Sequence, residues 1–109
     1  TPNLQIACEE TFAPIVSIVS YETLFDAIRL VNDSKLGLNA GIYTNVLTDA
    51  LFAADEIEAG AVIINDIPTF RTDNMPYGGV KMSGYGREGI KYAVEEMTDL
   101  KLISIKTSL

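Results

Sequence analysis

Length, composition and charge set the first limits on what this chain can be. Its 109 residues are enough for one small domain with a modest core, and an apolar content of 48% excludes a disordered tail. The 8 basic and 15 acidic residues give a net charge of −7, which argues against a nucleic-acid surface and against docking on an anionic membrane.

The residue types that are absent or rare narrow the chemistry further. The chain has no histidine and one cysteine, Cys8, so it can form neither a His-containing metal site nor a Cys–His or Ser–His couple, and we expect no bound metal. Glu9 and Glu10 disfavour a thiolate beside them, which favours a structural role for this cysteine. No apolar run is long enough to cross a bilayer and no signal peptide opens the chain, so the sequence predicts a cytoplasmic protein. The chain starts at Thr1 rather than Met, which either processing or a longer parent protein explains.

Strand-like and helix-like segments alternate from the start of the chain. Residues 14–20 hold a β-branched run with a proline at its edge and predict a strand. Residues 23–32 change to helical spacing and predict a helix. Residues 40–44 predict a short strand, which continues the alternation.

A second helix and a buried strand complete this pattern. The helix is predicted from an N-cap at Thr48 to about Glu58, and Gly60 would end it in the left-handed conformation. Residues 61–64 form a continuous apolar run, which is typical of a strand buried on both faces. Because strands that alternate with helices pair in parallel through crossovers, the sequence predicts an α/β fold with mostly parallel strands.

The last third of the chain predicts a long loop, a helix and a strand. The loop covers residues 66–87 with two prolines and four glycines, and a loop of this length in a compact domain is usually either functional or evidence that the elements are wrongly assigned. Residues 88–97 return to helical spacing, and residues 100–105 predict a final strand. That strand is either an edge strand of this domain or a strand that pairs with another chain.

Residues 84–89 of this loop, GYGREG, match the dinucleotide-binding pattern G-x-G-x-x-G. In nucleotide-binding folds the first of these glycines follows a strand. Here residues 75–83 contain a proline and two further glycines in place of a strand. We therefore predict that the glycines shape a tight turn before a helix.

The segment EETFAP, residues 9–14, allows two interpretations. Adjacent carboxylates of this kind usually belong to a solvated turn. Alternatively, one carboxylate accepts hydrogen bonds from a diol such as a ribose, and the aromatic ring stacks on the ligand. Spacing alone leaves both interpretations open.

Segments along most of the chain resemble, in order, motifs of the aldehyde dehydrogenase superfamily. Residues 9–14 resemble the family's E-E-x-F-[GA]-P, and residues 59–65, AGAVIIN, resemble A-G-x-V-x-[VI]-N. Residues 36–44, LGLNAGIYT, resemble Y-G-L-x-A-x-[VI]-[FY]-T, with Leu36 where the family usually has an aromatic. Residues 76–88, PYGGVKMSGYGRE, resemble P-[FY]-G-G-x-K-x-S-G-x-G-R-E.

The resemblance implies a division of the chain and a partner. Residues 1–99 would be the C-terminal part of a three-layer catalytic domain, and residues 100–109 an oligomerisation strand and tail. The family's terminal strand adds to the sheet of a neighbouring subunit. We therefore expect a homo-oligomer formed through residues 100–106, from Leu100 to Lys106.

The resemblance also implies an activity and site residues. In the family a cysteine thiolate attacks the aldehyde, hydride passes to NAD or NADP, and a glutamate activates the water that hydrolyses the thioester. By motif position, Glu10 matches the carboxylate at the nicotinamide-side ribose, and Phe12 matches the aromatic at the nicotinamide end of the cofactor. Tyr77 matches an aromatic at the aldehyde pocket. Arg71 lies in a loop like that of members acting on small hydroxy- or phospho-aldehydes, and it is either a contact for an anionic substrate group or a surface arginine.

The family's nucleophile has no counterpart in this chain. It lies in a G-Q-x-C segment, which does not occur here, and Cys8 does not match it. The resemblance therefore implies that the nucleophile, the general base and the dinucleotide-binding domain lie upstream, and we expect these 109 residues alone to be inactive. The competing hypothesis is a stand-alone assembly or regulatory module without catalysis.

Overall fold

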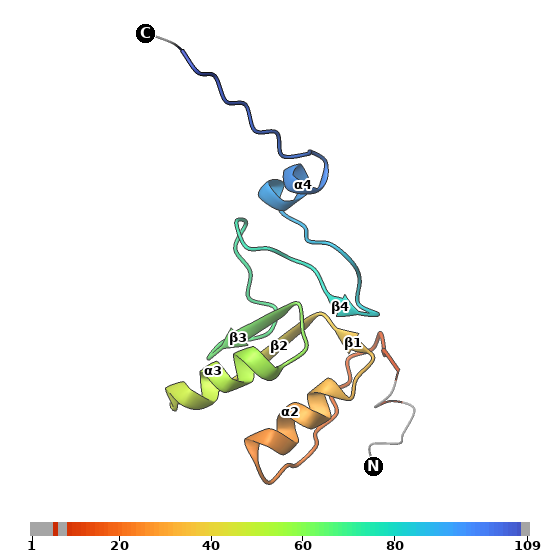
Figure 1. Ribbon diagram of the computed structural model, residues 1–109. Helices are drawn as coiled ribbons and strands as arrows, with labels where there is room; N and C mark the ends of the chain where they lie inside the picture. Colours follow the sequence, from red (N-terminus) through yellow and green to blue (C-terminus); the bar gives the residue numbers. More distant parts are fainter. Residues whose placement is uncertain (1–5, 7–8, 108–109) are drawn as a thin grey trace.

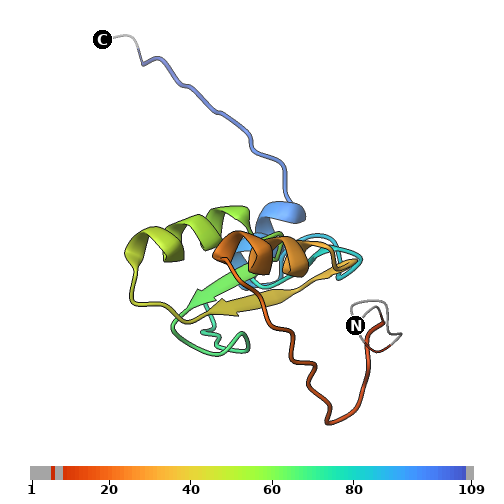
Figure 2. The ribbon, with the colours of Figure 1, turned by 90° about the horizontal axis from the view of Figure 1, so that it is seen from below.

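The chain places two helices on one face of a short parallel sheet and ends in an extended arm. The computed structural model describes residues 6 and 9–107, and Cys8 lies outside them. The elements in chain order are α2 (Leu24–Asn32), β1 (Leu36–Gly37), β2 (Asn39–Ile42), α3 (Leu47–Glu56), β3 (Ala61–Ile64), β4 (Val80–Lys81) and α4 (Ile90–Glu96) (Figure 1). Figure 2 shows α2 and α3 on one side of β2 and β3, with the segment that follows β3 on the other side.

The strands β2 and β3 are parallel neighbours, as the alternating pattern predicts. Asn39 pairs with Ala61 at one end of the ladder, and Ile42 pairs with Ile64 at the other. The crossover helix α3 packs against β3, and α2 packs against α3. The predicted α/β class and this β-α-β unit are therefore confirmed.

The helix α2 begins where the sequence predicts, because Thr23 caps it. The Thr23 hydroxyl accepts a hydrogen bond from the Asp26 amide at 3.1 Å and donates one to the Asp26 carboxylate at 2.6 Å. The cap satisfies an N–H group that has no partner within the helix, and the negative carboxylate in the first turn interacts favourably with the helix dipole. Ile28 is the buried residue of this helix.

The helix α3 differs from its prediction at both ends. It begins after Val46 rather than Thr48, without a side-chain cap, and it ends at Glu56. Gly60 lies beyond the helix and is not in the left-handed region. The glycine is required for another reason, since a Cβ at position 60 would overlap the Gly78 carbonyl oxygen. The predicted roles of Thr48 as N-cap and Gly60 as helix stop are therefore wrong.

The segment predicted as a loop over residues 66–87 contains the strand β4. It pairs antiparallel with β1, and Leu36 lies opposite Lys81. Strands of two residues carry no periodic pattern, so the sequence did not predict this pair. Lys81 has a φ of 55°, and the Ser83 amide donates to the Val80 carbonyl at 3.1 Å, so the chain turns sharply after the pair.

Two segments predicted as strands, residues 14–20 and 100–105, form no strand in this structure. A strand needs a neighbour for its backbone N–H and C=O groups, and neither segment has one among the described residues. Both expose apolar side chains: Ile18, for example, is 90% exposed. The C-terminal segment extends away from the rest of the chain (Figure 1). The prediction of an edge strand within this domain is therefore wrong, and pairing with another subunit stays a prediction.

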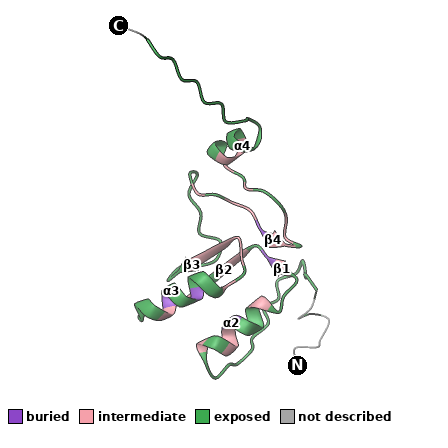
Figure 3. Cartoon of the chain, in the orientation of Figure 1, coloured by how far each residue is buried: buried purple, intermediate pink, exposed green. Residues whose placement is uncertain are grey.

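Few apolar side chains are buried in this chain. Among the described residues the buried ones are Ile28, Ala50 and Ala53, which lie on α2 and α3 (Figure 3). None of the described helices combines the length and the apolar character that a membrane span requires.

Candidate functional site

Arg71 and Tyr77, both expected at a substrate pocket, meet at one cleft. The Arg71 Cζ atom lies over the Tyr77 ring, 4.3 Å from its centroid. The cleft has a volume of about 410 Å³ and lies between the β2–β3 sheet and the segment that follows β3. Its lining residues are Asn39, Ala61, Val62, Ile63, Thr69, Phe70, Arg71, Met75, Pro76 and Tyr77.

The charge of this cleft comes from Arg71. It is the one charged side chain among the described residues that line the cleft, and the others are apolar or neutral. Its guanidinium makes no hydrogen bond or ion pair with another described residue. Since a guanidinium carries five N–H donors in a planar fork, the cleft offers a positive charge and hydrogen-bond donors to an anionic group.

The backbone of Tyr77 is held by an isolated antiparallel bridge to Glu88. The Tyr77 amide donates to the Glu88 carbonyl at 3.1 Å, and the Glu88 amide donates to the Tyr77 carbonyl at 2.5 Å. The Arg87 guanidinium donates to the Gly79 carbonyl at 3.0 Å, which ties the same two segments together again. The Tyr77 ring is therefore attached to a fixed stretch of backbone.

The loop that carries Arg71 is shaped by local turns. The Phe70 amide donates to the Ile67 carbonyl at 3.0 Å, and the Met75 amide donates to the Thr72 carbonyl at 3.0 Å. The Thr72 amide in turn donates to the Met75 sulfur at 3.4 Å. These bonds lie on either side of Arg71 and shape the backbone from which its side chain reaches the cleft.

The glycine-rich segment forms a turn before α4, as predicted. Gly84, Gly86 and Gly89 all have positive φ values, of 136°, 73° and 120°, and Gly89 is the N-cap of α4. The Arg87 amide donates to the Glu96 carboxylate at 3.2 Å, which ties the turn to the helix. The conclusion that these glycines shape a turn instead of a dinucleotide site is consistent with this geometry.

Glu10 and Phe12, expected at the cofactor, lie apart from Arg71 and Tyr77. Glu10 lines a second cleft of about 560 Å³ together with Ser34 and Glu58. Phe12 is 93% exposed. The Glu10 carboxylate makes no hydrogen bond with another described residue. The roles of Glu10 and Phe12 therefore stay predictions in this chain.

Asn39 lines both clefts, and it was not identified as a site residue from the sequence. It is the first residue of β2. The cleft with Glu10 and the cleft with Arg71 therefore share one lining residue, at the start of β2. The resemblance included this position only as a variable one, so no signal in the sequence marked it.

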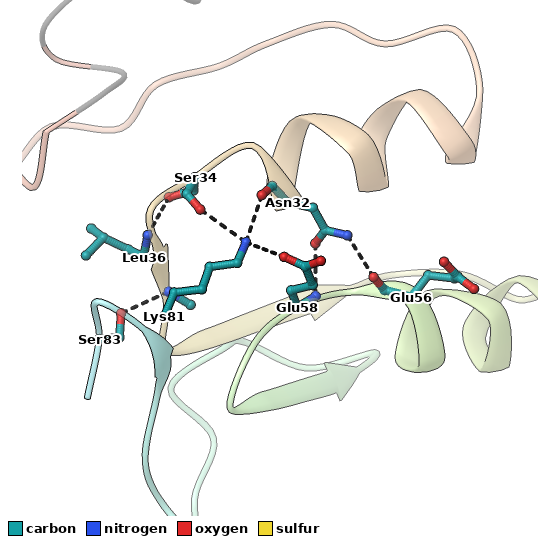
Figure 4. A network of polar contacts seen from close by, with 8 residues as sticks. Asn32, Ser34, Leu36, Glu56, Glu58, Lys81 and Ser83 are labelled. Carbon is teal, nitrogen blue, oxygen red and sulfur yellow. Dashed lines mark hydrogen bonds and ion pairs between the residues drawn. The ribbon is translucent and has the colours of Figure 1, made fainter. Parts of the chain in front are cut away.

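Lys81 is a second residue that sequence reasoning did not single out, although it lies inside a matched motif. Its ammonium contacts the Glu58 carboxylate at 2.7 Å and donates to the carbonyls of Asn32 at 2.7 Å and Ser34 at 3.1 Å (Figure 4). The Asn32 side chain donates to the Glu56 carbonyl at 2.7 Å and accepts from the Glu58 amide at 2.9 Å. This network joins the C-terminal ends of α2 and α3 to β4.

Among the described residues no group of three or more His, Cys, Asp and Glu side chains is arranged to hold a metal ion.

Comparison with known sequences identifies relatives over nearly the whole chain. Residues 1–103 match the sequence model of the aldehyde dehydrogenase family. A lactaldehyde dehydrogenase of Methanococcus maripaludis is 53% identical over 88% of this chain and 21% of its own length. A 3-sulfolactaldehyde dehydrogenase of Priestia megaterium is 50% identical over 93% of this chain and 21% of its own length. The chain thus spans about a fifth of the length of these relatives.

Comparison with solved structures gives the same fold. An indole-3-acetaldehyde dehydrogenase of P. syringae in complex with NAD⁺ superposes with a TM-score of 0.86, at 35% identity over 93% of this chain and 20% of that one. Aldehyde dehydrogenase 21 of Physcomitrella patens, in complex with the reaction product succinate, has a TM-score of 0.80 at 43% identity over 84% of this chain and 19% of that one. A glyceraldehyde-3-phosphate dehydrogenase of Methanocaldococcus jannaschii complexed with NADP has a TM-score of 0.67 at 49% identity, over 71% of this chain and 17% of that one.

Proposed function

Because this chain belongs to the aldehyde dehydrogenase family, we propose that it is part of an enzyme that oxidises a small aldehyde to a carboxylate with NAD or NADP. The matched structures include complexes with NAD⁺ and with NADP, which supports this class of reaction. The chain has no G-Q-x-C segment, so in this proposal the cysteine that forms the thioester lies in another part of the protein, and the family resemblance implies the same place for the glutamate that activates water.

Glu10 and Phe12 are the residues of this chain that would hold the cofactor. The chemistry of both side chains fits this role. A carboxylate with no hydrogen bond to another described residue has acceptor sites for two ribose hydroxyls, and an exposed aromatic ring can cover the face of a nicotinamide. The bound dinucleotide supplies the hydride acceptor, whereas Glu10 and Phe12 bind and orient it.

Arg71 would bind an anionic group of the aldehyde, and one observation carries this proposal. Its guanidinium is the single charge among the described residues of the cleft, and it makes no hydrogen bond or ion pair with another described residue. A small anionic aldehyde would replace that missing partner. The relative named for 3-sulfolactaldehyde and the relative solved with succinate support an anionic substrate.

The test uses the complete protein with a matched pair of aldehydes, 3-sulfolactaldehyde and lactaldehyde. NAD(P)H formation with either aldehyde is expected from the complete protein and not from the 109 residues alone. Arg71→Gln removes the charge but keeps a side chain of similar length. Since a hydrogen bond to a charged group contributes about 1.5–3 kcal/mol, we expect KM for 3-sulfolactaldehyde to rise roughly tenfold or more.

The same substitution is expected to change KM for lactaldehyde by less than about threefold, because that aldehyde carries no anionic group. An equal rise for both aldehydes would contradict the role of Arg71 and leave the reaction class untouched. Absence of aldehyde-dependent NAD(P)H formation in the complete protein would contradict the reaction class itself.

The proposal extends to architecture. Residues 1–99 would be part of a three-layer catalytic domain, in which residues 14–20 find the strand partners that they lack among the described residues. Residues 100–109 would form the oligomerisation strand and tail, pairing from Leu100 to Lys106 with a neighbouring subunit. The full exposure of Leu100 and the 93% exposure of Leu102 support a partner for this segment.

The exposed C-terminal arm, residues 100–107, also favours the second candidate, a stand-alone assembly or regulatory module. Such a module would use residues 100–106 to join other chains and would not need a cofactor contact. Glu10→Gln in the complete protein separates the two candidates. The enzyme interpretation predicts weaker NAD(P) binding in this variant, and the assembly interpretation predicts unchanged behaviour.

A further inference from the structure

The Arg71–Tyr77 pair combines a long, flexible side chain on a loop with an aromatic residue whose backbone is held by hydrogen bonds. Arg71 is an exposed residue of a loop, and its guanidinium contacts the Tyr77 ring instead of a hydrogen-bonding partner among the described residues. Tyr77 is half-buried, and its backbone is bonded twice to Glu88. A ring carried by this held backbone favours positions of the arginine side chain that lie against it.

The contact leaves the chemistry of the guanidinium available. At 4.3 Å from the ring centroid, the cation is within the range in which an aromatic face attracts it. A guanidinium stacked face-on against a ring would keep its N–H donors, which lie in its plane, available to a ligand, and the Arg71 guanidinium makes no hydrogen bond with another described residue. Sulfonate, phosphate and carboxylate groups accept hydrogen bonds from those donors.

We infer that Tyr77 is a positioning residue: its ring holds the Arg71 guanidinium at the cleft wall so that the outward N–H donors receive the anionic group of the aldehyde. This inference rests on the proposed role of Arg71. It gives Tyr77 a role in selecting anionic over neutral aldehydes, beyond that of an apolar wall. A side chain that is already ordered loses less conformational freedom when the substrate binds, so the ring improves affinity for the anion through the arginine.

The ratio of KM for 3-sulfolactaldehyde to KM for lactaldehyde, measured in the complete protein, tests this inference. Tyr77→Leu keeps an apolar wall and removes the ring, and we expect the ratio to rise about fivefold. Tyr77→Phe keeps the ring and is expected to keep the ratio close to that of the unchanged protein. Tyr85→Leu is the matched control, because Tyr85 is fully exposed and does not line this cleft, and it should not change the ratio.

A second series keeps the test informative if Tyr77→Leu does not fold. The reference for this series is the Tyr77→Phe variant, and position 77 then receives mono-, di- or trifluorophenylalanine. Fluorination weakens the attraction of the ring for a cation and changes its shape little. The KM ratio should rise in step with fluorination. A flat series, in a protein where Arg71→Gln raises the ratio, would overturn the role of Tyr77 and leave that of Arg71 intact. If Arg71→Gln itself leaves the ratio unchanged, both roles are overturned.

Discussion

Gly60 has no side chain, and this allows the backbone at Gly78, next to Tyr77 of the Arg71 cleft, to lie close to the sheet. It lies directly before β3, and its amide donates to the Gly37 carbonyl at 3.0 Å. A Cβ at this position would overlap the Gly78 carbonyl oxygen and would lie 2.9 Å from the Leu38 carbonyl oxygen. Both are backbone atoms, so a clash cannot be relieved by rotating a side chain. The segment at Gly78, which follows Tyr77, can therefore approach the sheet only because position 60 has no side chain.

We predict that Gly60→Ala destabilises the complete protein by about 3 kcal/mol, the upper part of the range for overpacking a close contact. Urea unfolding measures this loss. Gly41→Ala is the graded control in the neighbouring strand, where the nearest atom would lie 3.1 Å away, and it should cost less than half as much. Equal losses for the two variants would show that the backbone at Gly60 and Gly78 is not in close contact.

At the scale of elements, Lys81 holds together parts that are far apart in the sequence. Its three contacts reach the end of α2, the turn after it and Glu58 beyond α3 (Figure 4). The ion pair with Glu58 is a minor contribution because the Glu58 side chain is 59% exposed. The bonds to the Asn32 and Ser34 carbonyls matter more, since Lys81 is only 23% exposed and its ammonium supplies these carbonyls with donors.

Lys81→Met keeps most of the aliphatic stem and removes the ammonium, and we predict a loss of about 2 kcal/mol in the complete protein. The loss should appear first where β4 meets β1. Faster hydrogen exchange is therefore expected at the Gly37 amide, bonded to Ser83 Oγ, and at the Met82 amide, bonded to the Lys35 carbonyl. Glu58→Gln is the control and should cost less than about 1 kcal/mol. If Glu58→Gln costs as much as Lys81→Met, the ion pair and not the carbonyl bonds carries the stabilisation.

The elements also show how far the sequence predicts this structure. The helix α2 and the pair β2–β3 have signals within a few residues, namely helical spacing and apolar runs, and they were predicted. The pair β1–β4 depends on a φ of 55° at Lys81 and on bonds to residues almost fifty positions away, which no local pattern contains. Residues 14–20 have a strand's composition but no strand partner among the residues that the structure describes, so their local signal gave a state that this structure does not form.

The candidate site divides in the same way. Arg71 and Tyr77 were identified from a loop and a motif, and the structure brings them within 4.3 Å, a contact that spacing alone does not predict. Asn39, which lines both clefts, had no marker in the sequence because its position matters only once the strand and the two clefts are in place. Residue type therefore pointed to the chemistry, whereas the contact between residues required the fold.

At the scale of the whole molecule, this chain is larger and less buried than a self-sufficient domain of its length. Its radius of gyration is 19.1 Å, compared with about 13 Å for a compact domain of this size. Large apolar side chains remain exposed on two segments, near the N-terminus and along the arm. They are Phe12, Ile15, Val16, Ile18, Val19, Leu100, Leu102, Ile103 and Ile105. Since apolar surface of this extent is unfavourable in water, we expect it to be covered by other protein.

The last prediction concerns what covers the arm when nothing else is present. An extended segment with unpaired backbone groups and apolar side chains can add to a strand of another copy, so we predict that the purified 109-residue chain self-associates. Sedimentation velocity over a range of concentrations measures this association. Leu102→Glu places a charge in the middle of the arm, where pairing would bury it, and should shift the chain towards the monomer. Thr107→Glu adds the same charge outside the expected pairing segment and should leave the association unchanged. An equal effect of both variants would indicate that net charge, and not pairing of the arm, controls the association, because strand pairing depends on position whereas general repulsion does not.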